Sequence, residues 1–245
     1  MYPKIWIFDS YALMIFIGII LCFLFFYWFS KRLGYSIDYL LSVLILAILS
    51  IIIGFGFAVL VQWILDLLKG LDRELAMTFY GGLIGGVLTF ILGWCLVIKK
   101  KHPEASFIEI LEIAPACIMI AHGFGRIGCF LDGCCYGIRS RAWYSVRFPG
   151  MRYNVIPTQL FEAVFLITMA LALLILALYT EFKYEMSIYL ISYGVFRFLI
   201  EFLRGDERGY FLLKLSPAQW FSILAFITGI ALIFIIKKVS SRPRI

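Results

Sequence analysis

Apolar residues gather along the chain in seven long runs, and most of the connections between the runs are short and polar. A helix needs about 20 mostly apolar residues to cross the hydrocarbon core of a bilayer. The pattern therefore predicts an all-α integral membrane protein with about seven transmembrane helices, in which residues 1–245 form a single polytopic domain. The predicted spans are 10–29, 38–65, 77–98, 111–131, 157–180, 186–203 and 216–236.

The one long connection follows the fourth span, at residues 132–156. It combines arginines with Trp143, Tyr144 and Phe148, which are side chains suited to the depth of lipid headgroups. We predict an interfacial loop, while a strand-like hairpin and a soluble loop remain alternatives. The arginines of this segment are Arg139, Arg141, Arg147 and Arg152.

Composition agrees with a membrane protein and guides the interpretation of the charge. Apolar residues make up 63% of the chain and charged residues 15%, whereas about a quarter of a soluble domain is charged. The net charge is +7, but the basic residues are scattered between the apolar runs. They form no dense basic stripe of the kind that nucleic acid requires, so we expect no nucleic-acid partner.

The first span is expected to stay in the protein and not to be cleaved as a signal peptide, because it ends at Lys31 and Arg32 without a small-residue cleavage site. Two basic segments, 99–102 and 237–244, contain no acidic residue. This asymmetry predicts an N-terminus outside the cell and a C-terminus inside it. The opposite connections contain Asp66, Asp72, Glu74, Asp206 and Glu207.

Charged residues cluster in the sixth span, although each costs about 2.5–3.5 kcal/mol to insert at the centre of a membrane helix. Tyr193, Arg197, Glu201 and Arg204 are spaced by four, four and three residues and would share one helical face. Arg197 and Glu201 could form a structural ion pair that joins helices. The surplus of arginine favours an anionic ligand such as a phosphodiester, since guanidinium binds phosphate through two parallel hydrogen bonds.

Residues 122–137, HGFGRIGCFLDGCCYG, combine glycines with Arg126 and three cysteines. The G-x-G-x-x-G pattern at 123–128 is not a dinucleotide fingerprint, because no strand precedes it. Its glycines would let backbone N–H groups approach a phosphate. A second glycine segment, FYGGLIGG at 79–86, could do the same or could simply allow helices to pack closely.

Cys129, Cys134 and Cys135 allow three interpretations. A metal site is disfavoured, because the spacing is not C-x-x-C and only His122 lies near in sequence as a fourth ligand. A disulfide or a reactive thiol on the outer face is the second interpretation, and inert small residues that line a pocket are the third, which we adopt. The other cysteines are expected to be buried in apolar surroundings. They are Cys22, Cys95 and Cys117.

Six segments, in order along nearly the whole chain, resemble the motifs of one family. They are SYALMIFIGI (10–19), FYGGLIG (79–85), GRIGCFLDGCCYG (125–137), IPTQLFEA (156–163), YGVFRFLIEFLR (193–204) and LSPAQWFSI (215–223). The family is prolipoprotein diacylglyceryl transferase, a bacterial enzyme with seven spans. Its members transfer diacylglycerol from phosphatidylglycerol to the lipobox cysteine of a prolipoprotein signal peptide and release glycerol phosphate.

The resemblance implies a site in which Arg126 and Arg197 bind the phosphate and Glu201 orients Arg197, with Tyr80 completing the catalytic set. The thiol comes from the substrate protein, so neither a cofactor nor a metal is expected. The implied location is the bacterial cytoplasmic membrane. The residues implied to bind substrate are Tyr11, Gly81, Gly82, Cys129, Gly137, Gln159, Glu162, Tyr193 and Arg204.

The chain departs from the family pattern at several positions. Tyr80 stands where the family has a histidine, and tyrosine, with an ordinary pKa near 10, is a poor general base at neutral pH. Cys129 and Asp132 replace the two signature asparagines, and Cys134 replaces a glutamate. A related phospholipid-dependent transferase with another acceptor, and a non-enzymatic lipid-binding protein or transporter, therefore remain alternatives.

Overall fold

The computed structural model describes residues 4–5, 8–32, 34–69, 78–180, 182–205 and 215–240. Seven helices in these ranges are long and apolar enough to cross a membrane, one at each predicted span. The all-α membrane fold is confirmed. The elements are β1 (Lys4–Ile5), β2 (Phe8–Asp9), α1 (Ser10–Arg32), α2 (Ile37–Lys69), α3 (Phe79–Gly93), η1 (Trp94–Ile98), α4 (Lys99–Lys101), α5 (Phe107–Asp132), α6 (Thr158–Tyr179), α7 (Glu185–Ile200), η2 (Glu201–Leu203) and α8 (Pro217–Ser240).

The chain divides into two compact units, one made of Met1–Phe26 with Ile108–Ile245 and the other of Tyr27–Phe107. The single-domain assignment and the orientation of the termini both remain predictions. Four acidic residues that entered the orientation argument lie outside the described residues. They are Asp72, Glu74, Asp206 and Glu207.

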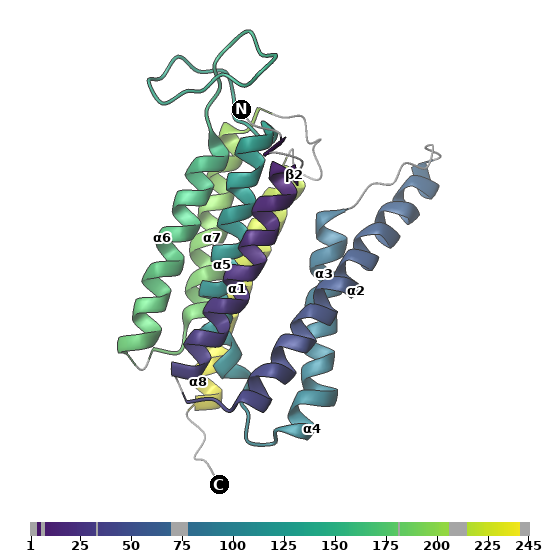
Figure 1. The fold of residues 1–245 in the computed structure, drawn as a ribbon, viewed down its shortest axis with the longest axis vertical. Coiled ribbons are helices and arrows are strands. Elements are labelled where there is room, and N and C mark those ends of the chain that lie inside the picture. The colour runs from purple at the N-terminus through teal and green to yellow at the C-terminus, as the bar shows by residue number, and fades with distance from the viewer. Residues whose placement is uncertain are drawn as a thin grey trace. The chain divides into compact units, whose positions relative to one another are not determined.

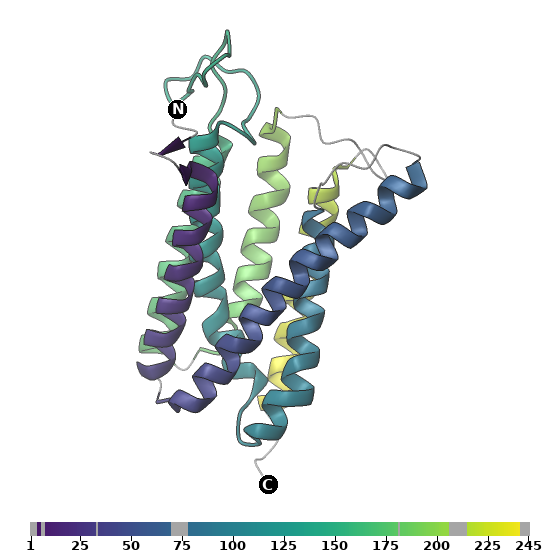
Figure 2. The same ribbon diagram turned by 45° about the vertical axis from the view of Figure 1, so that its right-hand side comes forward.

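The first unit is a bundle in which α1, α5 and α6 lie side by side (Figures 1 and 2). Its core forms between α5 and α6, where Met119 and Leu166 are completely buried. Helix α7 joins this core through Phe196, whose ring stacks on Phe165 with the centroids 4.1 Å apart. These contacts place the inner faces of α5, α6 and α7 opposite one another, and the polar residues of all three helices meet there.

Helices α7 and α8 pack closely because glycines face the contact. A Cβ atom added to Gly194 would lie 2.8 Å from the carbonyl oxygen of Ser222, and one added to Gly229 would lie 2.7 Å from Ile191 Cγ1. Small residues at such crossings let two helix backbones approach within a membrane.

We expect Gly194→Ala to destabilise the first unit by about 1–3 kcal/mol, because the new methyl group forces the backbones of α7 and α8 apart. Thermal unfolding of the purified protein in detergent measures the effect. Gly125→Ala is the matched control in α5, since a Cβ there would meet no described atom within 4 Å. An unchanged unfolding midpoint for the Gly194 variant would contradict this account of the contact.

The second unit contains α2 and α3, which cross in close contact (Figure 2). The glycine segment at the start of α3 makes this contact. A Cβ added to Gly81 would lie 2.9 Å from Val61 Cβ, and one added to Gly82 would lie 3.2 Å from Ala58 Cβ. Of the two interpretations of this segment, close packing of helices is therefore the one that these contacts support.

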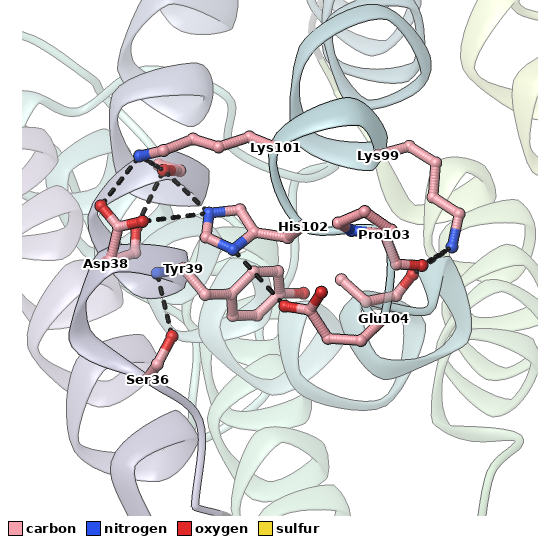
Figure 3. A network of polar contacts seen from close by, with 10 residues as sticks. Ser36, Asp38, Tyr39, Lys99, Lys101, His102, Pro103 and Glu104 are labelled. Carbon is pink, nitrogen blue, oxygen red and sulfur yellow. Dashed lines mark hydrogen bonds and ion pairs between the residues drawn. The ribbon is translucent and has the colours of Figure 1, made fainter.

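A polar network joins the start of α2 to the end of α4 in the same unit (Figure 3). Lys101 Nζ donates to Asp38 Oδ1 at 2.8 Å and to Ser42 Oγ at 3.0 Å. The buried imidazole of His102 lies between two carboxylates, with Nε2 3.5 Å from Asp38 Oδ2 and Nδ1 3.6 Å from Glu104 Oε1. The network fastens two helix ends of this unit to each other.

Candidate active site

Glu162 is the centre of a cluster of ionisable side chains in the first unit. Its carboxylate, on α6, is completely buried. Arg126 Nε on α5 lies 3.1 Å from Oε2, and Arg197 Nε on α7 lies 4.0 Å from Oε1. Tyr193 donates its hydroxyl proton to Oε1 over 2.7 Å. A buried carboxylate needs such partners, because an unpaired charge in the low dielectric of the interior is costly.

His122 belongs to the same cluster, although sequence reasoning considered it only as a metal ligand. Its Nε2 atom lies 3.8 Å from Glu162 Oε1, and its ring meets the Tyr193 ring edge-on at a centroid distance of 5.2 Å. A signal was present in the sequence. His122 and Arg126 are four residues apart on α5, as Tyr193 and Arg197 are on α7, and this spacing places each pair on one helical face.

Arg197 is held from a second side by Glu201, whose Oε2 atom lies 2.7 Å from Arg197 Nη2. Ser216 in turn donates its hydroxyl proton to Glu201 Oε1 at 2.7 Å, and its backbone N–H donates to Gln219 Oε1 at 2.9 Å. The buried Arg197 Nη1 atom has no hydrogen-bond partner among the described residues. A buried guanidinium nitrogen without a partner suits a ligand oxygen as its acceptor.

The predicted helical face does not extend as far as Arg204, which corrects the sequence interpretation. Helix α7 ends at Ile200, and Glu201–Leu203 form a single tighter turn. Arg204 has extended backbone angles and pairs in a β-bridge with Gly137. Arg204 therefore reaches its position through an extended backbone that pairs with Gly137 and not through helical spacing.

Gly137 lies where three segments meet. Its N–H donates to the carbonyl oxygen of Ile156 at 2.8 Å, and a Cβ atom at this position would lie 2.6 Å from the carbonyl oxygen of Leu203. The loop that follows α5 makes further bridges, between Arg139 and Val155 and between Val146 and Val155. It extends beyond the ends of α5 and α6 (Figure 1). Hairpin-like pairing is present, while the depth of the loop in a membrane remains a prediction.

The start of α6 fixes the turn that carries the cysteines. Gln159 Nε2 donates to the carbonyl oxygen of Cys134 at 2.5 Å, and Thr158 Oγ1 donates to that of Cys135 at 3.0 Å. None of the six cysteines, all of which the structure describes, forms a disulfide, and the sulfurs of Cys129, Cys134 and Cys135 lie within 4.8 Å of one another. The expectation of burial holds for Cys117, whereas Cys22 is only partly buried, and it is wrong for Cys95, which is exposed on the apolar surface of η1.

The thiol of Cys135 has two thiols and a guanidinium as neighbours. Hydrogen bonds with the thiols of Cys129 and Cys134, and then the guanidinium of Arg204, hold the pKa of Cys135 below its usual range. Arg126 also interacts electrostatically with Cys129 and Cys135. The sulfur cluster therefore lies near Arg126, one of the two arginines paired with Glu162.

The remaining predicted site residues fall into both units. Tyr11 lies at the start of α1 and interacts electrostatically with the three cysteines and with Arg126. Tyr80, Gly81 and Gly82 belong to the second unit, and the two glycines contact α2 as described.

The whole-chain pattern decides the family. Residues 5–235 match the sequence profile described as "Prolipoprotein diacylglyceryl transferase". The chain belongs to this family. It is similar to a phosphatidylglycerol–prolipoprotein diacylglyceryl transferase of Clostridium tetani, with 33% identity over 234 residues that cover 90% of each chain. It is also similar to the enzyme named phosphatidylglycerol–prolipoprotein diacylglyceryl transferase 2 of Clostridium perfringens, with 34% identity over 244 residues, or 95% of this chain and 92% of that one.

The family assignment confirms the resemblance that was drawn from the six motifs. It also makes the chain a transferase of the diacylglyceryl type that acts in lipoprotein maturation. Together with the seven apolar helices, it identifies a multi-pass bacterial membrane protein. The roles of individual residues are a separate matter.

Proposed function

We propose that this chain transfers the diacylglyceryl group of phosphatidylglycerol to the lipobox cysteine of a prolipoprotein signal peptide and releases glycerol phosphate. The two Clostridium relatives carry this donor and this class of acceptor in their names. The observation that carries the proposal is the pair of guanidinium groups, Arg126 and Arg197, on either side of the buried Glu162 carboxylate. An unpartnered nitrogen of Arg197 is available there for a phosphate oxygen.

The charge balance of the cluster suits a phosphodiester. Arg126 and Arg197 balance the charges of Glu162 and Glu201, and Arg204, which lies against Cys135 in the turn after α5, adds one positive charge next to this cluster. A phosphatidylglycerol headgroup carries one negative charge and would neutralise this added charge. The bidentate geometry of guanidinium would also orient the phosphate.

The reaction requires one substitution at carbon. The acceptor thiol gives up its proton, and its sulfur attacks the glyceryl carbon that is bonded to the phosphate oxygen. An S–C bond forms as the C–O bond breaks, and the electron pair of that bond leaves with glycerol phosphate. The developing negative charge falls on phosphate oxygens next to Arg126 and Arg197, where fixed donors in a low dielectric are most effective.

Other residues would support this arrangement. Glu162 and Glu201 hold the two guanidinium groups in place, and Tyr11 and Tyr193 border the headgroup. Gln159 fixes the turn after α5, whose path Gly137 permits. Tyr80 is a weak base at neutral pH, so removal of the thiol proton calls for another group.

The proposal is tested with purified protein in proteoliposomes of phosphatidylglycerol to which a lipobox peptide is added. Mass spectrometry is expected to detect a diacylglyceryl adduct on the peptide, with one glycerol phosphate released per adduct. Serine in place of the peptide cysteine, and phosphatidylcholine in place of the donor, should each prevent both products. Glycerol phosphate without an adduct would indicate a different acceptor, and folded protein that forms neither product would contradict the proposal.

A further inference from the structure

Three cysteine sulfurs meet where α5 ends. Cys129 lies in the last turn of the helix, and Cys134 and Cys135 follow in the turn after it. Their Sγ atoms all lie within 4.8 Å of one another. A zinc–sulfur bond is about 2.3 Å long, which places the sulfurs of a tetrahedral site about 3.8 Å apart. The cluster therefore needs to contract by about 1 Å or less to surround one ion.

The backbone turn that brings the sulfurs together includes conformations that cost free energy. The N–H groups of Gly133 and Cys134 both donate to the carbonyl oxygen of Cys129 at 3.1 Å, which folds the chain back over the helix end. Gly133 has a φ of +83° and Cys135 a φ of +65°. A left-handed conformation is uncommon for a residue with a side chain and stores strain, which is typical of functional positions.

The turn is also anchored from outside. The hydrogen bonds from Gln159 and Thr158 hold the carbonyl oxygens of Cys134 and Cys135 against the start of α6. Arg126 and Arg204 both interact electrostatically with the cluster. A divalent cation would cancel two of the three thiolate charges, so the occupied cluster would place one net negative charge beside these arginines. The surroundings are therefore built to position three thiols and to balance their charge.

We propose that Cys129, Cys134 and Cys135 bind a thiophilic divalent cation of the zinc type. Thiolates select soft and borderline metals, whereas calcium and magnesium require oxygen ligands. Three protein ligands leave one of four tetrahedral positions open, as in catalytic zinc sites and unlike structural ones. This conclusion departs from the sequence interpretation of the same cysteines as inert and from the expectation of no metal.

The open position would bind the acceptor thiol, a step that rests on the proposed function. A thiol that coordinates such a cation loses its proton, here to water, and becomes the sulfur nucleophile of the substitution. The S–C bond then forms as the C–O bond to phosphate breaks, and the cation is not consumed. This chemistry supplies a thiolate beside Arg126 without requiring Tyr80 to act as a base.

Metal binding is tested first, without lipid or peptide. The full chain in detergent is reduced, treated with a chelator and titrated with Co²⁺ or Cd²⁺, because zinc itself has no optical signal. Thiolate-to-metal charge-transfer absorbance should saturate at one ion per chain. In the wild-type protein, Cd²⁺ should protect three of the six cysteines from alkylation, as counted by mass spectrometry.

Serine variants test whether the charge-transfer absorbance comes from Cys129, Cys134 and Cys135. Cys129→Ser and Cys134→Ser are each expected to weaken binding at least about 100-fold, since each removes one of three ligands. Cys95→Ser is the matched control, because this thiol is exposed on η1, and it should bind like the wild type. Absence of the charge-transfer band, equal labelling of all cysteines with and without metal, or a disulfide between two of the three sulfurs in fresh protein would each overturn the proposal.

The open position is tested by adding the lipobox peptide to the Co²⁺ form. The charge-transfer absorbance should rise by about a third, because a fourth thiolate joins three, and a serine peptide should cause no rise. An unchanged spectrum with the cysteine peptide would overturn the role of the open position. A metal site without any adduct formation would contradict the proposed function alone, whereas adduct formation at the wild-type rate by Cys134→Ser would contradict the metal's part in it.

Discussion

Glu162→Gln is expected to abolish diacylglyceryl transfer and to destabilise the protein by about 3–5 kcal/mol, the usual cost of leaving a buried charge without its partner. The carboxylate is completely buried and lies against both Arg126 and Arg197. Removing its charge leaves Arg126 and Arg197 with Glu201 alone. The arginines would then repel each other and move from the positions that a phosphate requires.

The measurements are thermal unfolding in detergent and adduct formation in proteoliposomes. Glu104→Gln is the matched control: its side chain is 75% exposed, so losing its contact with His102 should cost no more than about 1 kcal/mol and leave turnover unchanged. A Glu162→Gln protein with wild-type stability and turnover would show that this carboxylate does not organise the cluster.

Arg197→Lys should lower the transfer rate by about 10²–10³-fold while the protein remains folded. Lysine keeps the positive charge but lacks the planar fork. In the structure, Nη2 of Arg197 pairs with Glu201 Oε2 at 2.7 Å, and Nη1 has no hydrogen-bond partner among the described residues. A lysine ammonium cannot occupy both positions, so it would pair with a carboxylate and leave the phosphate without its donor.

Initial rates at several phosphatidylglycerol concentrations separate binding from chemistry. A donor that acts on the leaving phosphate predicts a fall in kcat as well as in kcat/KM. Arg141→Lys is the control, because Arg141 is exposed in the loop that follows α5. If Arg197→Lys retained full activity, charge alone would be sufficient, and the bidentate contact would have no catalytic role.

Sequence reasoning predicted correctly those features for which the membrane imposes a large free-energy cost on the alternatives. Long apolar runs have few alternatives to a spanning helix, so the seven spans could be predicted with bounds close to those observed. Arg126, Arg197 and Glu201 stood out for a related reason, because charges within a span are rarely retained without a role.

The parts that could not be predicted depend on contacts between elements. The end of α7 at Ile200 is set by its surroundings, so helical spacing misplaced Arg204. His122 carried only a local signal, and its partner Glu162 lies 40 positions further along the chain. The proximity of the three cysteine sulfurs likewise depends on the reversal at Gly133 and on anchors from α6, which their C-x4-C-C spacing does not reveal.

The carboxylate shared by Arg126 and Arg197 has a consequence for turnover. A site with bare arginines would hold a glycerol phosphate dianion more tightly than the singly charged donor, and the enzyme would be inhibited by its own product. Glu162 lies within 4.0 Å of both guanidinium groups and competes with any bound phosphate. If the arginines bind phosphate as proposed, Glu162 stays paired with both of them throughout the cycle, so a departing dianion would leave no uncompensated guanidinium and its release would not be opposed.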